Sequence, residues 1–350
     1  MKIDGRELLH TEGDSSRPSV PYEPLHAERS SRRLAAPLLL AVAFSSAVAV
    51  FGIDSLAIDR GLWDEGEPTW GPAYWVRTAL CAVSAIAAVL ALVRINGDRR
   101  ADEGVQLRPL DRLVVAAIPA GALFFVALLA VSPRYFTRFA LEDRPVEWVS
   151  VLLLFGACAL VLLATRRVAA STSERRWLLL GPLALAGVFF LIAMEEVSWF
   201  QRVLSVETPE SLASNAQGEL NFHNFATGLS ENGYYFGAFL ALMMVPLALQ
   251  AFGMRLPGPL APFAPTPVVA LVSAPAFAFN FDMWDIALSQ LAFYGAVAVL
   301  MLWVIHEVDA GDRRLVIGMA GATVVVQLMM LTLGDRSDLI WDATEYKEMF

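Results

Sequence analysis

Long apolar blocks recur along the chain, separated by short polar segments. A helix of about twenty residues is long enough to cross a hydrocarbon core about 30 Å thick. The pattern therefore predicts an all-α, polytopic bundle of transmembrane helices. The nine predicted spans are Leu34–Ile53, Tyr74–Val93, Leu113–Val131, Trp148–Ala164, Trp177–Ala193, Tyr235–Phe252, Val268–Phe281, Ile286–Ile305 and Leu315–Leu333.

The seventh predicted span is the weakest. Val268–Phe281 is short for a span, contains Pro275 and follows the Pro/Gly-rich stretch Pro257–Pro267. The alternative is eight spans plus a re-entrant segment. That alternative would move Arg313 and Arg314 to the other side of the membrane, against the distribution of the remaining arginine pairs.

Positively charged residues are unevenly divided between the two sides of the predicted bundle. Positive loop residues are retained in the cytoplasm. With a cytoplasmic N-terminus and nine spans, every adjacent arginine pair falls on the cytoplasmic side. These pairs are at positions 32/33, 99/100, 166/167, 175/176 and 313/314. We therefore predict a multi-pass protein of the cell (inner or plasma) membrane, with its N-terminus inside and its C-terminus outside.

The same pattern divides the chain into three regions. Residues 1–33 are polar and lack apolar periodicity, which predicts a disordered cytoplasmic tail. Residues 34–333 form the transmembrane helical domain, with an outer-face segment at 195–233. Residues 334–350 form an acidic C-terminal tail. No loop is long enough to bury a core of its own.

Composition narrows the possible functions. The chain is 57% hydrophobic and 17% charged, whereas soluble domains are about 25% charged. A net charge of −9 without a basic, aromatic-rich patch excludes nucleic acid as a partner. The two cysteines, Cys81 and Cys158, lie within apolar blocks and predict buried side chains with no disulfide or metal site. Membrane lipids are the expected partners, and the sequence specifies no protein partner.

Most acidic residues fall on the outer loops. For the C-terminal tail and for Asp64–Glu67 we expect a solvated surface. The adjacent Glu195 and Glu196 differ, because carboxylates at a membrane boundary usually face a cavity, a partner or an ion. An apolar stripe predicts that the fifth helix continues past them, with Glu195, Ser198 and Arg202 on one face. The alternative is an interfacial helix end whose glutamates reach water, with Trp199 as an anchor.

Polar residues alternate with apolar ones further along this outer segment. Glu219, Asn221 and His223 would point the same way on a short extended stretch. His223 is the only histidine on the predicted outer face, so a zinc site built from several histidines is not expected. A hard divalent cation such as Mg²⁺ or Ca²⁺, held by carboxylates and amides, remains open. His223 also suits a general acid or base.

A second candidate cluster lies between the seventh and eighth predicted spans. Asp282 and Asp285 occur there in a turn that is otherwise apolar. Acidic residues in so apolar a setting usually face a cavity or a partner, so we include both among the candidate substrate-binding residues.

The outer segment carries a recognisable series of short motifs. They are Glu195-Glu196-Val197-Ser198-Trp199, Gln201-Arg202, Glu207-Thr208-Pro209-Glu210, Gln217-Gly218-Glu219, Asn221 and His223-Asn224. This series resembles a signature of uncharacterised bacterial multi-pass membrane proteins. Many of those proteins have glycine at the position of Phe200 and leucine at that of Phe222. The resemblance implies that the segment acts as one unit, and it implies no mechanism.

These residues lead to a first functional hypothesis. It is an integral-membrane enzyme with an outer-leaflet site, acting on a lipid or lipid-linked substrate that contains phosphate. Glu195 or Glu196 would be the base or a cation ligand, and Glu219 or His223 the second acid or base. Arg202 would bind the phosphate. The other expected substrate-binding residues are Trp199, Gln201, Asn221, Asn224, Asp282 and Asp285.

Two alternatives belong to other functional classes. One is a transporter or ion-binding membrane protein, suggested by the carboxylates near the membrane and by the interrupted seventh span. The scarcity of acidic residues inside the first four spans, Asp54 apart, counts against it. The other is a non-catalytic assembly factor whose acidic outer face docks a partner.

Overall fold

The computed structural model describes residues 25–58, 61, 63–96, 106–141, 144–171, 177–209, 220, 227–306, 309–337 and 345–350. Across these residues the regular elements are helical, which confirms the predicted all-α bundle. Eight helices in this part of the chain are long and apolar enough to cross a membrane. The elements are α1 (Leu25–Ile53), η1 (Asp54–Ile58), α2 (Pro72–Asn96), α3 (Pro109–Val131), α4 (Pro133–Ala140), α5 (Pro145–Ser171), α6 (Leu180–Glu196), η4 (Ser198–Phe200), α7 (Gln201–Leu204), α8 (Thr227–Phe239), η7 (Leu240–Met244), α9 (Val245–Phe252), η8 (Gly258–Phe263), α10 (Pro267–Val272), η9 (Ala274–Phe277), α11 (Ala287–His306), α12 (Arg313–Leu333), η10 (Gly334–Arg336) and α13 (Glu345–Met349).

Proline marks the start of many of these helices. The helices α2, α3, α4, α5 and α10 each begin at a proline. The first residue of a helix needs no backbone N–H, and the fixed φ of proline is already helical, so this position favours it. The run α8–η7–α9 forms one long helix with a π-helical turn just before Pro246. A widened turn accommodates a proline inside a helix.

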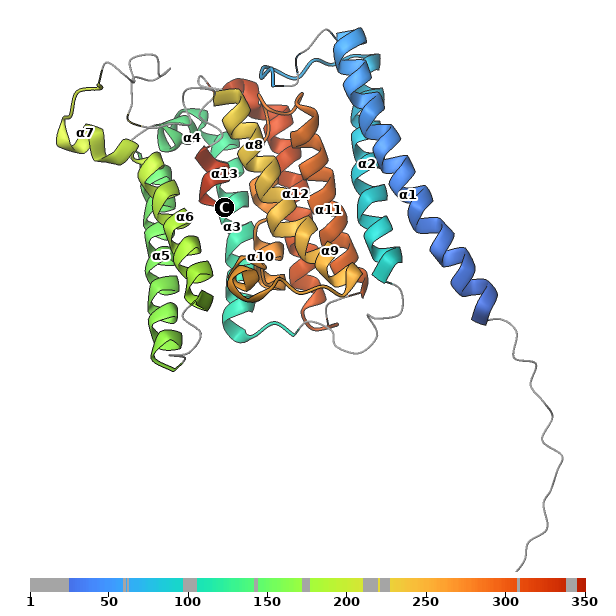
Figure 1. The fold of residues 1–350 in the computed structure, drawn as a ribbon. Helices are drawn as coiled ribbons and strands as arrows, with labels where there is room; N and C mark the ends of the chain where they lie inside the picture. The colour runs from blue at the N-terminus through green and yellow to red at the C-terminus, as the bar shows by residue number, and fades with distance from the viewer. Residues whose placement is uncertain are drawn as a thin grey trace, which may run out of the picture.

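The long helices are arranged as a central group flanked by two hairpins (Figure 1). The α1–α2 hairpin lies on one side and packs on α11, and the α5–α6 hairpin lies on the other. Between them stand α3, α8–α9, α11 and α12, and α3 packs along α12. The termini of the long helices thus gather at two opposite ends of the bundle.

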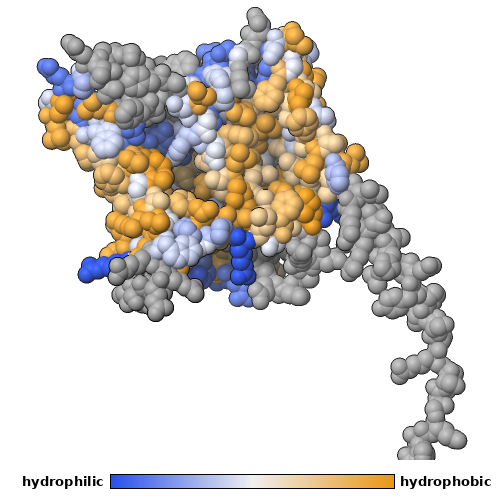
Figure 2. Space-filling model, in the orientation of Figure 1, coloured by the Kyte–Doolittle hydropathy of each residue, from blue (hydrophilic) through white to orange (hydrophobic). Residues whose placement is uncertain are grey.

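The outward faces of the helices are strongly apolar. Phe44, Leu152 and Leu160 are 73%, 64% and 69% exposed. Figure 2 shows hydrophobic side chains over the middle of the visible face, with hydrophilic ones gathered toward its two ends. So much exposed apolar surface is unfavourable in water and matches a lipid environment. The chain is a membrane-spanning helical protein.

The seventh predicted span, Val268–Phe281, does not form one long helix. It is divided into α10, η9 and a non-helical stretch. The chain nevertheless passes from one end of the bundle to the other. Leu271 of α10 belongs to the same hydrophobic cluster as Leu107 near the start of α3, and α10 contacts α3. In contrast, the carbonyl of Asp282 accepts a hydrogen bond from Gly66 near the start of α2. Successive helices run in opposite directions, so these two starts lie at opposite ends.

Side-chain amides from neighbouring helices stabilise this irregular stretch. Residues 277–286 are all buried. Gln327 of α12 donates from Nε2 to the carbonyl oxygen of Asn280 at 2.7 Å, and Gln290 of α11 donates to that of Trp284 at 2.9 Å. Non-helical backbone at membrane depth is tolerated only where it is buried in protein and its polar groups are satisfied. The two glutamines satisfy these two backbone carbonyl oxygens.

The α5–α6 hairpin meets η8 through a close backbone approach at Gly181. A Cβ atom at this position would lie 1.5 Å from the carbonyl oxygen of Pro259. Because that atom belongs to the backbone, it cannot rotate away. We expect Gly181→Ala to force α6 away from η8 and to lower the free energy of unfolding by about 1–3 kcal/mol. Unfolding in mild detergent with increasing SDS measures the change.

Gly187 on the same helix provides the matched control. A Cβ atom there would meet nothing within 4 Å. Gly187→Ala should therefore leave stability unchanged or raise it slightly, since alanine is the better helix former by about 1 kcal/mol. Equal unfolding curves for the two alanine variants would contradict the proposed contact.

Candidate functional site

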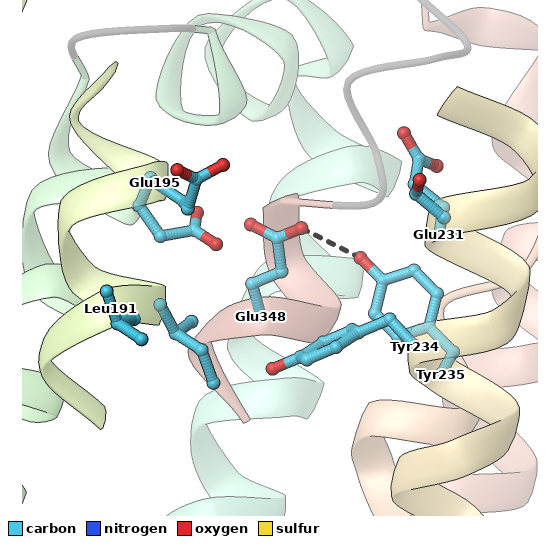
Figure 3. A pocket seen from close by; sticks show the side chains of 9 residues that line it. Leu191, Glu195, Glu231, Tyr234, Tyr235 and Glu348 are labelled. Atoms are coloured by element: carbon cyan, nitrogen blue, oxygen red, sulfur yellow. Dashed lines mark hydrogen bonds between the residues drawn. The ribbon is translucent and has the colours of Figure 1, made fainter. Parts of the chain in front are cut away.

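A cavity of about 310 Å³ lies between α6 and α8, beside α13 (Figure 3). Its walls combine carboxylates and tyrosines with apolar side chains. The lining residues are Leu191, Ile192, Glu195 and Glu196 of α6, Ser230, Glu231, Tyr234 and Tyr235 of α8, and Glu348 of α13. Four of the nine are glutamates, so the cavity can bind a cation or a proton donor, and its apolar wall can accommodate a hydrocarbon chain.

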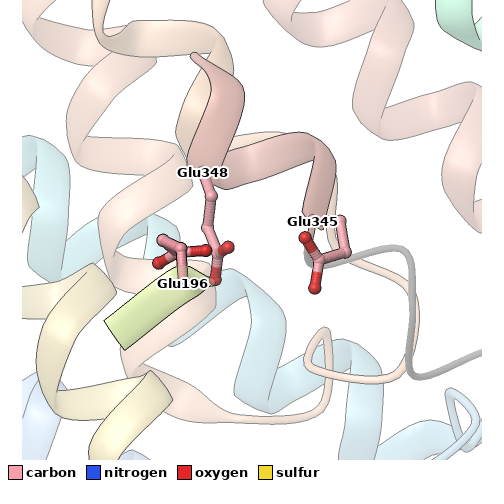
Figure 4. A group of neighbouring side chains, drawn as sticks. All are labelled: Glu196, Glu345 and Glu348. Carbon is pink, nitrogen blue, oxygen red and sulfur yellow. The ribbon is translucent and has the colours of Figure 1, made fainter. Parts of the chain in front are cut away.

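Three carboxylates from two distant parts of the chain converge beside this cavity. Glu196 at the end of α6 lies with Glu345 and Glu348 of α13, and one oxygen from each is within 4.8 Å of the others (Figure 4). Three such anions repel one another at this distance, and protons or a bound cation relieve the repulsion. Oxygen ligands of this kind suit a hard divalent cation such as Mg²⁺ or Ca²⁺.

Tyr235 connects the cavity to the interior of the bundle. Its hydroxyl donates to Oε1 of Glu348 at 2.9 Å. On the other side of the ring, Nζ of Lys347 lies 4.7 Å from the ring centroid, a distance typical of a cation–π interaction. Tyr235 is 8% exposed. Its side chain lies between the outer cavity and the buried amine of Lys347.

Lys347 is a buried cation at the centre of an acidic group. It is 3% exposed, and its Nζ lies 2.8 Å from Sδ of Met283. Burial lowers the pKa of Lys347 to about 8, while the negative charges of Asp282, Glu231, Glu65 and Glu348 act in the opposite direction. An amine with this pKa exchanges its proton near neutral pH.

Asp282 lies close to this amine and is even more enclosed. It is 1% exposed, and both of its carboxylate oxygens are buried. Burial raises the pKa of Asp282, and the charge of Lys347 partly offsets that rise. The sequence-based prediction singled out Asp282 as a candidate, and it lies beside Lys347 instead of lining the outer cavity.

The loop before α2 adds a further carboxylate. Glu65 accepts a hydrogen bond from Nδ2 of Asn232 at 3.2 Å. Burial, and next the charge of Asp282, raise the pKa of Glu65. We expected Asp64–Glu67 to be a solvated surface, and for Glu65 that expectation is wrong. The loop folds inward because the amide of Gly66 donates to the carbonyl of Asp282 at 2.9 Å.

The structure brings some of the predicted site residues together. Glu195 and Glu196 both line the cavity. Trp199 donates from Nε1 to Oε1 of Glu195 at 2.8 Å and so orients that carboxylate. Asp285 accepts two hydrogen bonds from Thr69, from the backbone N–H at 2.9 Å and from the hydroxyl at 2.8 Å, and thereby holds the loop before α2.

Other predicted residues lie elsewhere. Gln201 is buried but does not line the cavity, and it holds the following segment through Thr208 at 2.8 Å and the backbone N–H of Leu220 at 2.6 Å. Arg202 is exposed on α7 and does not line the cavity either. Four further predicted residues lie outside the part of the chain that the structure describes. They are Glu219, Asn221, His223 and Asn224.

The expected continuation of the fifth span is wrong. The helix α6 ends at Glu196, and the next residues Ser198, Trp199 and Phe200 have φ angles of 43°, 55° and 59°. Left-handed residues interrupt the helical repeat, so Glu195, Ser198 and Arg202 do not share a face. Each such residue is unfavourable by about 1–3 kcal/mol and is found mostly at functional sites.

Sequence reasoning missed the contribution of α13. We expected residues 334–350 to be a solvated acidic tail, yet Tyr346 and Lys347 are 0% and 3% exposed. The aromatic residues Tyr346 and Phe350 within an otherwise charged segment were the available signal. Their rings pack against Phe279. This packing positions α13, and with it Glu345, Lys347 and Glu348, at the site.

The site is thus assembled from α6, α8, α13 and the loop before α2. Its carboxylates, its buried amine and its apolar wall are all supplied by this one chain. No family model, no curated protein and no solved structure matches the chain.

Proposed function

We propose that the chain is an integral-membrane enzyme that acts on a lipid or lipid-linked substrate containing phosphate, with the cavity between α6 and α8 as its active site. The observation that carries this proposal is the pairing of carboxylates with an apolar wall in one cavity. Glu196 and Glu348 are on one part of its surface, and Leu191 and Ile192 are on another. An amphipathic substrate needs both surfaces.

The carboxylates would act through a divalent cation. A phosphate is repelled by Glu196, Glu345 and Glu348, unless a cation lies between them. A Mg²⁺ or Ca²⁺ ion held by these three groups would bind the phosphate and stabilise negative charge that develops during its transfer or hydrolysis. Glu195, oriented by Trp199, would then be the general base. Because Arg202 does not line the cavity, this proposal gives the phosphate-binding role to the cation.

The proposed location is the outer leaflet of the cell membrane. The arginine pairs support a cytoplasmic N-terminus, and this orientation places the end of α6 at the outer face. Figure 2 supports access from the lipid, because the visible face is hollowed beside hydrophobic surface. A substrate in the membrane would then reach the cavity laterally.

Substitution of the clustered carboxylates tests the proposal. The assay uses protein in vesicles of phosphatidylethanolamine and phosphatidylglycerol that contain a polyprenyl phosphate and a polyprenyl diphosphate, with Mg²⁺, and mass spectrometry detects new lipid products. We expect Glu348→Gln and Glu196→Gln each to reduce turnover by about 100-fold. Both substitutions keep side-chain size, so folding should be retained.

Glu207 supplies the control, because it is exposed and does not line the cavity. Glu207→Gln should turn over lipid like the unaltered protein, and chelation of divalent cations should inhibit both. The proposal is wrong if the unaltered protein converts none of these lipids, or if Glu196→Gln and Glu348→Gln remain fully active.

A transporter is the second candidate, and the interrupted pass through α10 and η9 favours it. Broken helices beside charged residues are found at the substrate sites of transporters. Here the break is followed directly by Asp282, near Lys347. Uptake of an ion or a lipid into sealed vesicles, with no covalent product, would favour this function over an enzyme.

A further inference from the structure

The outer cavity has carboxylates on two of its sides. Glu196 and Glu348 of its lining converge with Glu345 and are the proposed ligands of a divalent cation. Glu231 is outside that group and lines the cavity from α8, opposite Glu195 on α6 (Figure 3). The lining residues that the structure describes include no lysine, arginine or histidine. A second positive group can therefore be accommodated on the α8 side.

The carboxylate of Glu231 is available to a ligand. Within the described part of the chain it makes no hydrogen bond and no ion pair. The charges that act on it are those of Glu65, Glu348 and Asp282, which are negative, and that of Lys347, which is positive. The negative charges outnumber the positive one, so a positively charged ligand group beside Glu231 would relieve repulsion.

A tyrosine ring lies next to this carboxylate. Tyr234 follows Glu231 by three residues on α8, so the two side chains are neighbours on one face of the helix, and both line the cavity. The rings of Tyr234 and Tyr235 are 5.4 Å apart at 71°, and Tyr234 is 48% exposed. Aromatic rings set at steep angles bind ammonium groups through cation–π interactions. In this molecule the ammonium of Lys347 already lies over the ring of Tyr235, 4.7 Å from its centroid.

The apolar part of the cavity begins one helical turn away from its carboxylates. Leu191 precedes Glu195 by one turn of α6 and is 52% exposed. In the described part of the chain, α6 packs along α5 and against η8, and not along α8. Hydrocarbon chains can therefore extend from the cavity between α6 and α8, while the polar end of the same molecule stays beside the glutamates.

We infer that the ligand of this cavity is a phospholipid whose head group carries an ammonium group, and that Glu231 and the ring of Tyr234 bind this ammonium. The phosphate of the same head group would bind the cation held by Glu196, Glu345 and Glu348. This inference rests on the proposed lipid site. It narrows the substrate from any phosphate-containing lipid to a zwitterionic phospholipid, and it makes Glu231 a specificity-determining residue.

Simpler ligands use less of the cavity. A second metal ion would bind Glu231 and would leave the ring of Tyr234 and the apolar wall unused. An anionic phospholipid would fill the apolar part, but its head group would leave the charge of Glu231 without compensation. A zwitterionic phospholipid satisfies the carboxylate, the ring, the cation cluster and the apolar wall together.

The affinities of two matched lipids test the inference. Phosphatidylethanolamine and phosphatidylglycerol with the same acyl chains share the phosphate, and the second has an uncharged glycerol in place of the ammonium. Native mass spectrometry of the full chain in mild detergent with Mg²⁺ gives the Kd of the first bound lipid. We expect phosphatidylethanolamine to bind at least about tenfold more tightly, because a charge-assisted hydrogen bond to Glu231 has about that effect on affinity.

Two substitutions on α8 locate the source of this preference. Glu231→Gln keeps the size of the side chain and removes its charge, so it should weaken binding of phosphatidylethanolamine by about tenfold and should not weaken that of phosphatidylglycerol. Tyr234→Leu removes the ring and should weaken binding of phosphatidylethanolamine by about threefold or more. Glu207 is exposed and does not line the cavity, so Glu207→Gln is the matched control and should keep the full preference. Unfolding with SDS confirms that each variant is folded.

Three results would overturn the inference. The first is that the unaltered chain binds neither lipid, or binds both with the same Kd. The second is that folded Glu231→Gln keeps the preference for phosphatidylethanolamine. The third is that Glu207→Gln loses it as Glu231→Gln does, which would assign the preference to the overall charge of the outer face.

These measurements detect no product, so they separate the inference from the proposed enzyme. A chain that prefers phosphatidylethanolamine through Glu231 and converts no lipid would keep the inference and reject the enzyme. A chain that converts a polyprenyl phosphate and does not distinguish the two phospholipids would keep the enzyme and reject the inference.

Discussion

Replacing Arg77 with methionine is expected to lower the free energy of unfolding by about 3–5 kcal/mol, because it leaves a buried carboxylate without its cation. Arg77 is 1% exposed within a membrane-spanning helix. Its guanidinium pairs with Asp54 through two contacts and also donates to the carbonyl oxygen of Asp285. Methionine keeps much of the length of arginine and none of its charge. Unfolding in mild detergent with increasing SDS measures the loss.

A second substitution separates charge from packing in this prediction. Asp54 is 7% exposed, so its charge has little access to water once Arg77 is gone. The double variant Asp54→Asn with Arg77→Met removes both charges and should recover much of the stability, as apolar replacements of whole buried ion pairs often do. If the double variant is less stable than Arg77→Met alone, the ion pair is not the cause.

The sequence indicated one half of this pair. Asp54 stood out as an acidic residue at the end of an otherwise apolar span, whereas Arg77 lies near the start of the second predicted span and was not identified as its partner. Its partner could not be identified, because the pairing depends on the way α1 and α2 pack as antiparallel neighbours. Spacing along the chain contains no signal for a contact across 23 residues.

The helices themselves were largely predictable, because apolar length alone identifies a spanning helix. Predicted span 113–131 corresponds to α3, and span 286–305 to α11. The division of the seventh span into α10 and η9 was less accessible. It depends on Gln327 and Gln290, which reach from other helices to satisfy the irregular backbone. A hydropathy pattern does not contain that information.

The candidate site was predictable to a similar degree. Glu195 and Glu196 were identified because adjacent carboxylates at a membrane boundary require compensation. The residues that lie with Glu196, namely Glu345 and Glu348, were not identified. A five-residue charged helix has no periodicity long enough to show that it packs inside a bundle, so only the three-dimensional structure relates α13 to α6.

Tyr346 is the residue on which the position of α13 depends most. It is 0% exposed, its ring stacks on Phe136 at 4.4 Å between centroids, and its hydroxyl donates to the carbonyl of Phe136 at 2.7 Å. Tyr346→Ala is expected to weaken the docking of α13 by about 3–5 kcal/mol, as for other buried aromatic side chains. Undocking would withdraw Glu345, Lys347 and Glu348 from the site together.

The sequence has two lysines, Lys2 and Lys347. In protein labelled with ¹⁵N at the lysine side chains, the NMR signal of the Lys347 amine, assigned with Lys2→Arg, measures this docking directly. In Tyr346→Ala the amine should enter water, so its pKa should rise from about 8 toward the ordinary 10.5 and its proton exchange should accelerate. Tyr346→Phe keeps the ring and loses one hydrogen bond, worth about 1 kcal/mol, so it should leave the titration of Lys347 in place. An unchanged titration in Tyr346→Ala would mean that other contacts, such as the stack of Phe350 on Phe279, hold α13 without Tyr346. If Tyr346→Ala instead raises the pKa of Lys347 and abolishes lipid turnover, then the docking of α13 positions both the buried amine and the carboxylate cluster.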